Sequence, residues 1–265
     1  MKKSLYILFV LFMIACNGGP DTSSVSSTNP PNAPRMISYS VLNTYPHDTS
    51  YFTEGLLIYK SDLYESTGEK GRSVLVKTDL KTGKALKKID LDNKYFGEGI
   101  AILNDTIYQL TYQEKVGFMY SVKDFKKLGE FTFASREGWG MTTDGQYIIA
   151  SDGSSNLYYY EPSTFKFLRT LGVTEAGSPA FNLNELEYID GYIYANQWQY
   201  PYILKIDPSD GKVVGKIDLS QITTTIKSKY PFAEFLNGIA YDSATKKMYI
   251  TGKWWPELYE IELSK

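Results

Sequence analysis

The sequence predicts an all-β fold, a five-bladed β-propeller with four antiparallel strands in each blade. Five copies of one repeat follow each other along the chain, and a strand left over at the front completes the last repeat. Aromatic residues make up 15% of the 265 residues, with 23 tyrosines, a composition that suits half-buried strands. A hydrophobic content of 43% is enough for a sizeable core.

Each repeat opens with a short apolar strand that carries a polar or aromatic residue beside a glycine. Successive openings are 44, 41, 46 and 52 residues apart when these positions are taken as equivalent: Gly55, Gly99, Gly140, Leu186 and Gly238. Second and third strands follow, and turn residues such as Lys81-Thr82-Gly83 lead to a fourth. The third strands are expected at Val74–Thr78, Gly117–Ser121, Asn156–Tyr160, Tyr202–Ile206 and Leu258–Glu262. Four strands at this period are typical of a propeller blade.

The fifth repeat ends at Lys265 after three strands. A strand from Met36 to Thr44 is left over at the front of the chain and can supply the missing outer strand. This pairing closes the ring and covers two otherwise exposed sheet edges.

The N-terminus reads as a leader rather than as part of the fold. Lys2 and Lys3 precede a short apolar run to Ala15, which is of signal-peptide length and too short to cross a membrane. Residues 13–16 resemble a bacterial lipobox, which predicts a signal peptide over 1–15 and lipidation of Cys16; the alternative is a plain secretory leader with an incidental cysteine.

Residues 16–35 are rich in Ser, Pro, Asn and Gly and are expected to form a flexible tether before a propeller domain at 36–265. The protein is then expected at the bacterial cell envelope, facing the periplasm or the cell surface. The lipid would be its only contact with the membrane.

Charge and composition exclude several classes of function. The formal net charge is −2, and without the leader 26 basic residues face 30 acidic ones, so nucleic acid is not expected as a partner. His47 is the only histidine and is expected in an exposed turn. With Cys16 as the only cysteine, a zinc site of several His or Cys ligands is excluded, and so is a Ser-His-Asp or Cys-His hydrolase. Carboxylates and carbonyls could still bind calcium.

Two columns of residues at equivalent blade positions point to a pocket at the central channel. The first strands contribute Glu54, Glu98, Trp139, Glu185 and Asn237, and the ends of the second strands contribute Gly68, Tyr112, Asp152, Trp198 and Lys253. Acids, aromatics and one lysine suit a small cationic or amide-bearing ligand, although such columns could also merely plug the channel. Desolvation between Phe96 and Ile100 would raise the pKa of Glu98, and a nearby lysine would lower it. A carboxyl group with a pKa near neutrality could move protons in both directions.

Seven motifs in order, at blade spacing, resemble the plant- and bacterial-type glutaminyl cyclases, a family of five-bladed propellers unrelated to the zinc-dependent animal enzymes. They are Phe52-Thr53-Glu54-Gly55, Phe96-Gly97-Glu98-Gly99, Gly138-Trp139-Gly140-Met141, Leu183-Asn184-Glu185-Leu186-Glu187, Asn196-Gln197-Trp198, Leu236-Asn237-Gly238-Ile239 and Gly252-Lys253-Trp254-Trp255-Pro256. The resemblance covers residues 36–265, and implies a catalytic domain that uses neither metal nor cofactor.

The resemblance implies that Glu98 is the general acid and base, and that Asn184, Trp198 and Lys253 line the pocket. Glu54 stands where the family often has glutamine, and Tyr112 where some members have tryptophan. The expected catalytic residues are Glu98, Lys253 and Asn184; the expected substrate-binding residues are Phe52, Glu54, Tyr112, Trp139, Trp198 and Glu185.

The implied reaction converts the N-terminal glutamine of a peptide or protein to pyroglutamate and releases ammonia, and a monomer is expected. Two alternatives from other classes stay open at the level of the sequence. One is a non-enzymatic propeller lipoprotein that binds ligands or acts as a scaffold in the cell envelope, since fold does not determine function. The other is a calcium-dependent lactonase or related hydrolase, for which the ring of carboxylates is the argument.

Overall fold

The structure, a computed structural model, describes residues 33–264, and these belong to one unit that spans 32–265. The predicted signal peptide, Cys16 and the tether as far as residue 32 lie outside the described residues. In the part that is described, no helix has the length and hydropathy needed to cross a membrane.

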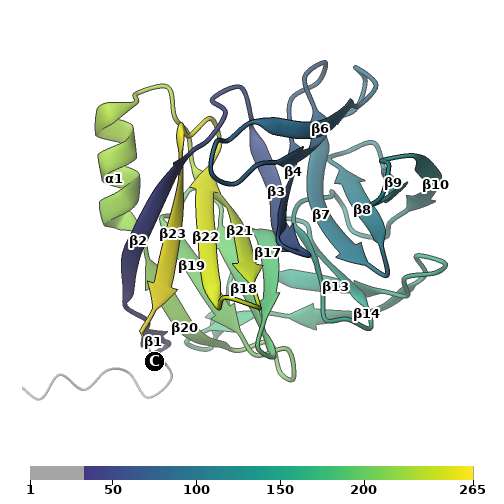
Figure 1. The fold of residues 1–265 in the computed structure, drawn as a ribbon. Coiled ribbons are helices and arrows are strands. Elements are labelled where there is room, and N and C mark those ends of the chain that lie inside the picture. Colours follow the sequence, from purple (N-terminus) through teal and green to yellow (C-terminus); the bar gives the residue numbers. More distant parts are fainter. Residues whose placement is uncertain (1–32, 265) are drawn as a thin grey trace, which may run out of the picture. The chain divides into compact units, whose positions relative to one another are not determined.

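Five four-stranded antiparallel sheets surround a central axis, as the repeats predicted (Figure 1). From the inner to the outer strand, the blades are β3 (Thr53–Tyr59), β4 (Asp62–Thr67), β5 (Val74–Thr78) and β6 (Ala85–Asp90); β7 (Gly97–Leu103), β8 (Thr106–Thr111), β9 (Val116–Ser121) and β10 (Lys127–Thr132); β11 (Met141–Thr143), β12 (Ile148–Ser151), β13 (Asn156–Tyr160) and β14 (Phe167–Gly172); β17 (Leu183–Ile189), β18 (Tyr192–Gln197), β19 (Tyr202–Ile206) and β20 (Val213–Asp218); and β21 (Leu236–Asp242), β22 (Lys247–Gly252), β23 (Glu257–Leu263) and β2 (Tyr39–Pro46). A small hairpin of β15 (Thr174–Glu175) and β16 (Ser178–Pro179) lies between the third and fourth blades in sequence.

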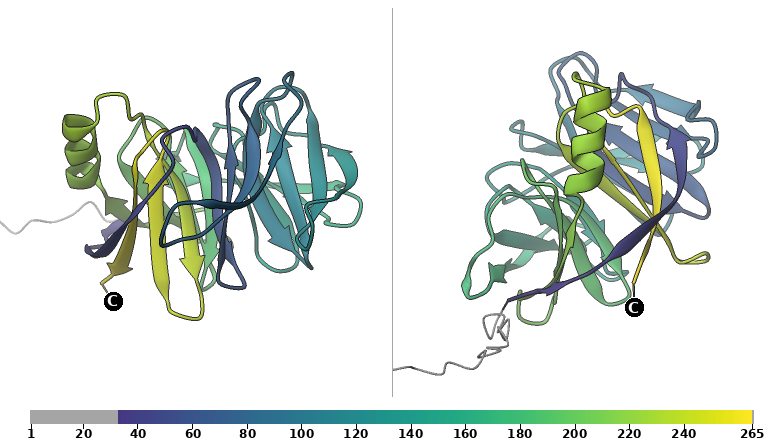
Figure 2. Two further views of the ribbon diagram at one scale, coloured as in Figure 1. Left: turned by 45° about the horizontal axis from the view of Figure 1, so that its top comes forward. Right: turned by 90° about the vertical axis from the view of Figure 1, so that its left-hand side faces the viewer.

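The ring closes as expected, through an N-terminal strand that completes the fifth blade. Strand β2 pairs with β23 in antiparallel fashion, from Tyr39 opposite Leu263 to Pro46 opposite Glu257 (Figure 2). This strand begins and ends later than the predicted Met36 to Thr44. The residues before it form a separate strand, β1 (Arg35–Met36), which adds in parallel to the outer edge of β20 in the neighbouring blade. The N-terminal segment therefore joins two blades.

Five apolar clusters fill the spaces between neighbouring blades, one at each junction. Between the first two blades, for example, Leu57 and Leu75 meet Ile100 and Ile107, and all four are buried. A fully buried aliphatic side chain contributes about 1.5–3 kcal/mol. Face-to-face packing of the blades therefore stabilises the ring, and buried polar residues such as Glu54 and Glu98 lie at the axis instead.

The inner strands approach each other closely at the glycines of the repeat. A Cβ on Gly140 would lie 2.0 Å from the Asn184 carbonyl oxygen, and one on Gly99 would lie 2.5 Å from the Met141 nitrogen. In four blades the inner strand also has an irregular register at this point, with one extra residue relative to the second strand. Such bulges redirect side chains and are common beside active sites. The residues at the irregular positions are Glu54; Glu98 and Gly99; Asn184 and Glu185; and Asn237 and Gly238.

One helix, α1 (Ser220–Lys229), interrupts the strands of the described chain, between the fourth and fifth blades. It accounts for the longer spacing of 52 residues before the last repeat. Ile222 and Ile226, four residues apart, share one face of the helix and are buried against both blades. Lys227 and Lys229 lie in its last turn, where cations interact favourably with the helix dipole.

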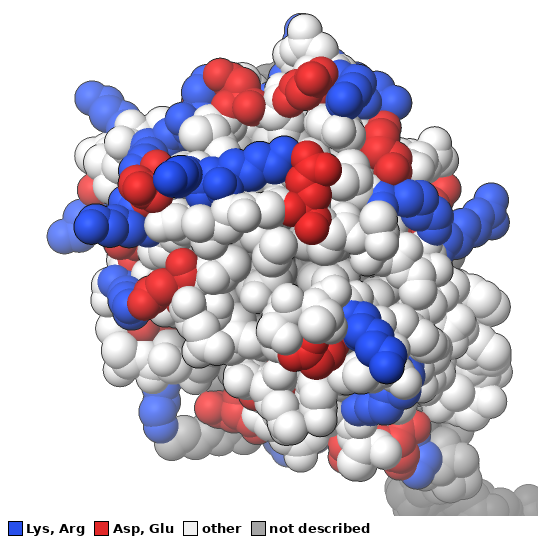
Figure 3. Space-filling model, turned by 90° about the vertical axis from the view of Figure 1, so that its right-hand side faces the viewer, with Lys and Arg blue, Asp and Glu red and all other residues white. Residues whose placement is uncertain are grey.

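The surface of the second and third blades carries mixed charge. On the face drawn in Figure 3, Lys and Arg side chains alternate with Asp and Glu, and a broad uncharged area lies between them. On that face there is no continuous basic patch of the kind that nucleic-acid binding requires.

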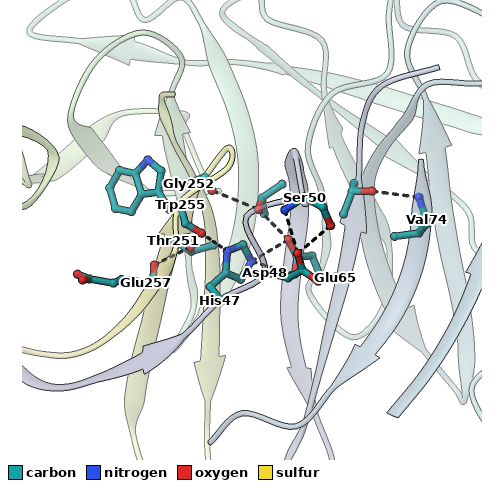
Figure 4. A network of polar contacts seen from close by, with 11 residues as sticks. His47, Asp48, Ser50, Glu65, Val74, Thr251, Gly252, Trp255 and Glu257 are labelled. Carbon is teal, nitrogen blue, oxygen red and sulfur yellow. Dashed lines mark hydrogen bonds and ion pairs between the residues drawn. The ribbon is translucent and has the colours of Figure 1, made fainter. Parts of the chain in front are cut away.

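The prediction of an exposed turn at His47 is wrong. The residue is buried, with 7% of its surface exposed, between the fifth and first blades (Figure 4). Its Nδ1 lies 2.6 Å from the Trp255 carbonyl oxygen and its Nε2 lies 3.1 Å from both carboxylate oxygens of Glu65. Both ring nitrogens face acceptors, so only the imidazolium form, with two N–H donors, satisfies both contacts.

The charge of His47 is coupled to its surroundings. Burial by itself lowers the pKa of His47, but the Glu65 carboxylate and the two hydrogen bonds outweigh burial, so the pKa is raised above its ordinary value of 6.5. Thr53 donates a further hydrogen bond of 2.7 Å to Glu65. The buried pair thus joins the segment before the first blade to β3, β4 and the turn that follows β22.

We expect His47→Ala to lower the free energy of unfolding by about 3–5 kcal/mol, because it leaves Glu65 buried without its cation. Since the folded-state pKa of His47 is raised, the stabilisation is complete below pH 6.5 and is lost as the pH rises through that pKa. Urea unfolding on both sides of this range measures the effect, and the variant should lack the pH-dependent step.

The exposed pair of Lys60 and Asp105, with side chains 64% and 62% exposed, provides the control. Lys60→Ala should leave the unfolding midpoint unchanged, because exposed ion pairs contribute little. A His47→Ala protein as stable as the wild type would contradict this account of the buried pair.

Candidate functional site

A cavity of about 210 Å³ opens at the axis, where the inner strands begin. Its walls are aromatic and its polar groups are few, which is typical of a small-molecule site. The lining residues are Phe52, Glu54, Phe96, Glu98, Tyr112, Trp139, Asn184, Trp198, Glu234, Phe235 and Lys253.

A repeated backbone contact positions the two columns of residues that line this pocket. In four blades, the residue at or just after the end of the second strand donates its backbone N–H to a carbonyl oxygen just before the inner strand. The four hydrogen bonds, of 2.7–3.0 Å, run from Gly68 to Phe52, Tyr112 to Phe96, Trp198 to Asn182 and Lys253 to Phe235. The fold therefore brings residues from distant parts of the chain together at the opening of one pocket.

Glu54 and Lys253 form a buried ion pair between the first and fifth blades, where the ring closes. The Lys253 Nζ lies 2.5 Å from Glu54 Oε1, and Asn237 Nδ2 donates to Glu54 Oε2 at 3.0 Å. The ammonium group also lies 4.3 Å from the centre of the Phe52 ring, at cation–π distance. Burial raises the pKa of Glu54, and Lys253 opposes that shift.

Glu98 is 5% exposed, and its carboxyl group makes no hydrogen bond to any residue that the structure describes. Its backbone carbonyl, by contrast, accepts the Ser66 hydroxyl. Burial, and next the charge of Glu54, raise the pKa of Glu98 well above 4.5, and Lys253 opposes them. The result is a carboxyl group at the pocket wall that holds its proton unusually tightly and has no protein partner for it.

Aromatic rings form the sides of the pocket. Trp139 and Trp198 meet edge to face with centroids 5.4 Å apart, and Phe96 lies 5.8 Å from Tyr112 and 6.0 Å from Phe52. The indole N–H of Trp139 donates to Glu137 at 3.0 Å, so it is occupied. The indole N–H of Trp198 has no partner among the described side chains and is available to a ligand.

Asn184 is 3% exposed and lines the pocket with an amide group that no described residue satisfies. Its Oδ1 is fully buried and has no hydrogen-bond partner there. Buried polar atoms in proteins are nearly always paired, so an unpaired amide at a cavity wall indicates a place for a polar ligand.

Eight of the nine predicted catalytic and substrate-binding residues line one pocket, and Glu185 does not. Glu185 is completely buried, and its carboxylate accepts the backbone N–H groups of Leu56 at 3.2 Å and Ile239 at 2.8 Å. It therefore joins β17 to β3 and β21 below the pocket. Glu185 shares an irregular stretch of β17 with Asn184, and it is Asn184 that lines the pocket.

Three lining residues were missed from the predicted site: Phe96, Glu234 and Phe235. Two of them carry a recognisable signal, because Phe96 and Phe235 lie two residues before Glu98 and Asn237, as Phe52 lies before Glu54. Glu234 has no counterpart in the repeat. No group of three or more His, Cys, Asp or Glu side chains in the described chain is arranged to hold a metal ion.

Comparisons with known proteins agree with this geometry. A family model described as glutamine cyclotransferase matches residues 10–263. A glutaminyl-peptide cyclotransferase of Arabidopsis thaliana is 40% identical over 233 residues, which cover 87% of this chain and 73% of that protein. The crystal structure of Myxococcus xanthus glutaminyl cyclase aligns with a TM-score of 0.81 at 33% identity, covering 87% of this chain and 98% of the other.

We expect Lys253→Met to lower the free energy of unfolding by about 3–5 kcal/mol, because it leaves the buried Glu54 without its cation. In the double variant Glu54→Gln, Lys253→Met, neither charge remains, and Gln can still accept the hydrogen bond from Asn237. The double variant should recover most of the lost stability. Urea unfolding followed by tryptophan fluorescence measures both; a double variant no more stable than the single one would show that the charge pair is not the cause.

Proposed function

Because this chain belongs to the glutamine cyclotransferase family, we propose that its pocket converts the N-terminal glutamine of peptides and proteins to pyroglutamate and releases ammonia. The single observation that carries the proposal is the convergence of three groups in one small cavity. These are the Glu98 carboxyl group, the Lys253 ammonium group and the unpaired amide of Asn184. An intramolecular acyl transfer to the α-amine requires a group that moves a proton and donors to the carbonyl oxygen, and these three groups can supply both.

The size and walls of the pocket suit one terminal residue. Its volume of about 210 Å³ is below the 300–1,000 Å³ typical of pockets for drug-sized ligands. An aromatic face such as that of Trp198 can hold an N-terminal amine in its protonated form through a cation–π contact. Asn184 and the Trp198 indole offer hydrogen bonds to the side-chain amide of glutamine.

In the proposed reaction the substrate's α-amine attacks its own γ-carbonyl carbon. A C–N bond forms to close the five-membered ring, the bond from that carbon to the amide nitrogen breaks, and ammonia leaves. Nucleophile and electrophile belong to one residue, so holding the side chain folded back supplies proximity without a covalent enzyme intermediate. Glu98 accepts a proton from the attacking amine and delivers it to the departing nitrogen.

The γ-carbonyl oxygen gains negative charge during the attack and requires donors. Lys253 from the fifth blade, and Asn184 and the Trp198 indole N–H from the fourth, supply them. Removal of one such donor typically costs about 2.7–4 kcal/mol of transition-state stabilisation. Glu54, paired with Lys253 at 2.5 Å, fixes the position of the ammonium group.

The raised pKa of Glu98 determines the pH dependence of the reaction. Its base form appears only as the pH rises through a pKa well above 4.5, and the substrate amine must also be neutral to attack. The rate should therefore rise with pH through that pKa. Above that pKa, Glu98 begins each cycle as the base. The proton that it takes from the amine converts it to the acid form, which then protonates the leaving nitrogen.

The experiment that tests the proposal is incubation of the purified protein with a peptide that begins with glutamine. We expect stoichiometric ammonia release, and the peptide should lose the mass of one NH₃. Both should be unaffected by a metal chelator. Hydrolysis that a chelator abolishes would favour the calcium-dependent alternative, and the absence of any reaction would favour a binding or scaffold protein.

We expect Glu98→Gln to lower kcat/KM about 10²–10⁴-fold, because glutamine cannot carry the proton. The thermal midpoint should stay near the wild-type value, since the carboxyl group makes no hydrogen bond that the substitution would break. Glu187→Gln is the matched control and should keep the wild-type kcat/KM. Burial also raises the pKa of Glu187, to about 8, but this inner-strand residue lies outside the pocket. A Glu98→Gln enzyme with wild-type kcat/KM would remove Glu98 from the mechanism.

A further inference from the structure

We infer that a second cavity, beside the pocket, binds the side chain of the residue that follows the N-terminal glutamine, and that it favours a large apolar or aromatic side chain. The inference rests on the proposed function, since it assigns the next part of the same peptide. The cavity has a volume of about 520 Å³ and lies between α1, the turn after β18 and the segment that enters β21.

The first step is that the rest of the peptide chain must leave the pocket close to the reacting atoms. The carbonyl carbon of the terminal glutamine is bonded both to the Cα that carries the attacking amine and to the nitrogen of the second residue. A pocket of about 210 Å³ is smaller than those that hold drug-sized ligands and suits the terminal residue alone. The chain therefore passes over one of the pocket walls.

The second step is that two residues, Glu234 and Phe235, line both cavities. Glu234 is held to Lys253 by a backbone hydrogen bond of 2.8 Å, and its backbone carbonyl accepts the Trp255 indole N–H at 2.9 Å. The shared wall is therefore fixed to the residue that we place at the γ-carbonyl oxygen. The Glu234 carboxylate can accept hydrogen bonds from peptide N–H groups that cross this wall.

The third step is the chemistry of the second cavity. Tyr200, Pro201, Phe235 and Leu236 give it an apolar surface. Tyr200 is 48% exposed and stacks on Tyr202 with centroids 6.3 Å apart, so its ring is held in place while one side stays open. Exposed apolar surface next to a catalytic pocket is typical of a binding site.

The fourth step is that the wall formed by α1 is an addition to the blades. All five sheets are complete without this helix, which accounts for the long spacing before the last repeat. Its apolar face is anchored in the core through Ile222 and Ile226, and Thr224 and Lys227 line the cavity. The Lys227 Nζ lies 5.7 Å from the Phe235 ring, so its aliphatic stem extends along the wall.

The test compares two substrates, Gln-Phe-amide and Gln-Gly-amide, in the ammonia-release assay. We expect kcat/KM to be about 10-fold higher for Gln-Phe-amide, because the phenyl ring leaves water on binding. Thr224→Trp should place a large side chain in the cavity and reduce the preference, and Tyr200→Ala should also reduce it. The rate with Gln-Gly-amide should stay unchanged in both variants, because neither residue lines the catalytic pocket.

The matched control is Thr225→Trp, on the same helix. Thr225 is exposed as Thr224 is, but it lines a different cavity next to β2. This variant should keep the preference for Gln-Phe-amide. Loss of the preference in both tryptophan variants would overturn the inference, since it would point to a general disturbance of the helix.

Failure of the inference is distinguishable from failure of the proposed function. If wild-type protein releases ammonia from both amides with equal kcat/KM, the function stands and the inferred subsite is wrong. If it releases ammonia from neither, both are wrong. Persistence of the full 10-fold preference in Thr224→Trp would also overturn the subsite, because the indole then occupies part of the space that the phenyl ring needs.

Discussion

The site depends on the close approach of the inner strands at the axis. Glycine at the repeat position lets the backbones meet, as at Gly140, where a Cβ would lie 2.0 Å from the Asn184 carbonyl oxygen. The bulge at the same level turns a polar residue of each irregular strand away from the regular ladder. Five blades packed through apolar clusters hold this arrangement rigid. The acid of Glu98 and the amide of Asn184 then come from the inner strands themselves, and the ammonium group of Lys253 comes from the turn that follows β22.

The surroundings give different roles to the three carboxylates that occupy equivalent positions in the inner strands. Glu54 is paired with Lys253, Glu185 is satisfied by two backbone N–H groups, and Glu98 has no described partner. All three are buried, and burial raises the pKa of each. What separates them is the number of groups that favour the charged form. Only Glu98 combines a raised pKa with a free carboxyl group at the pocket.

The repeat made the architecture predictable because its signals are local. Glycine beside a polar residue recurs in each blade, and the third strands at Asn156–Tyr160 and Tyr202–Ile206 match the predicted bounds. The errors arise where a role depends on distant partners. His47 is buried by contacts with Trp255, 208 residues away, and with Glu65. Which of Asn184 and Glu185 lines the pocket depends on the bulge in β17, and periodicity does not encode that choice.

The pairing of β2 with β23 also determines where the two ends of the described chain lie relative to the pocket. Pro46 and Glu257 lie at one end of that pair, next to the turn that carries Lys253, whereas Tyr39 and Leu263 lie at the other. Eight residues of strand separate the two ends by about 25 Å. Strand β1 and the end of β23 lie close together at one end of the sheets (Figure 1). The pocket opens at the other end, where the inner strands begin. A surface that contacts this side of the propeller would therefore leave the mouth of the pocket open to approaching polypeptide ends.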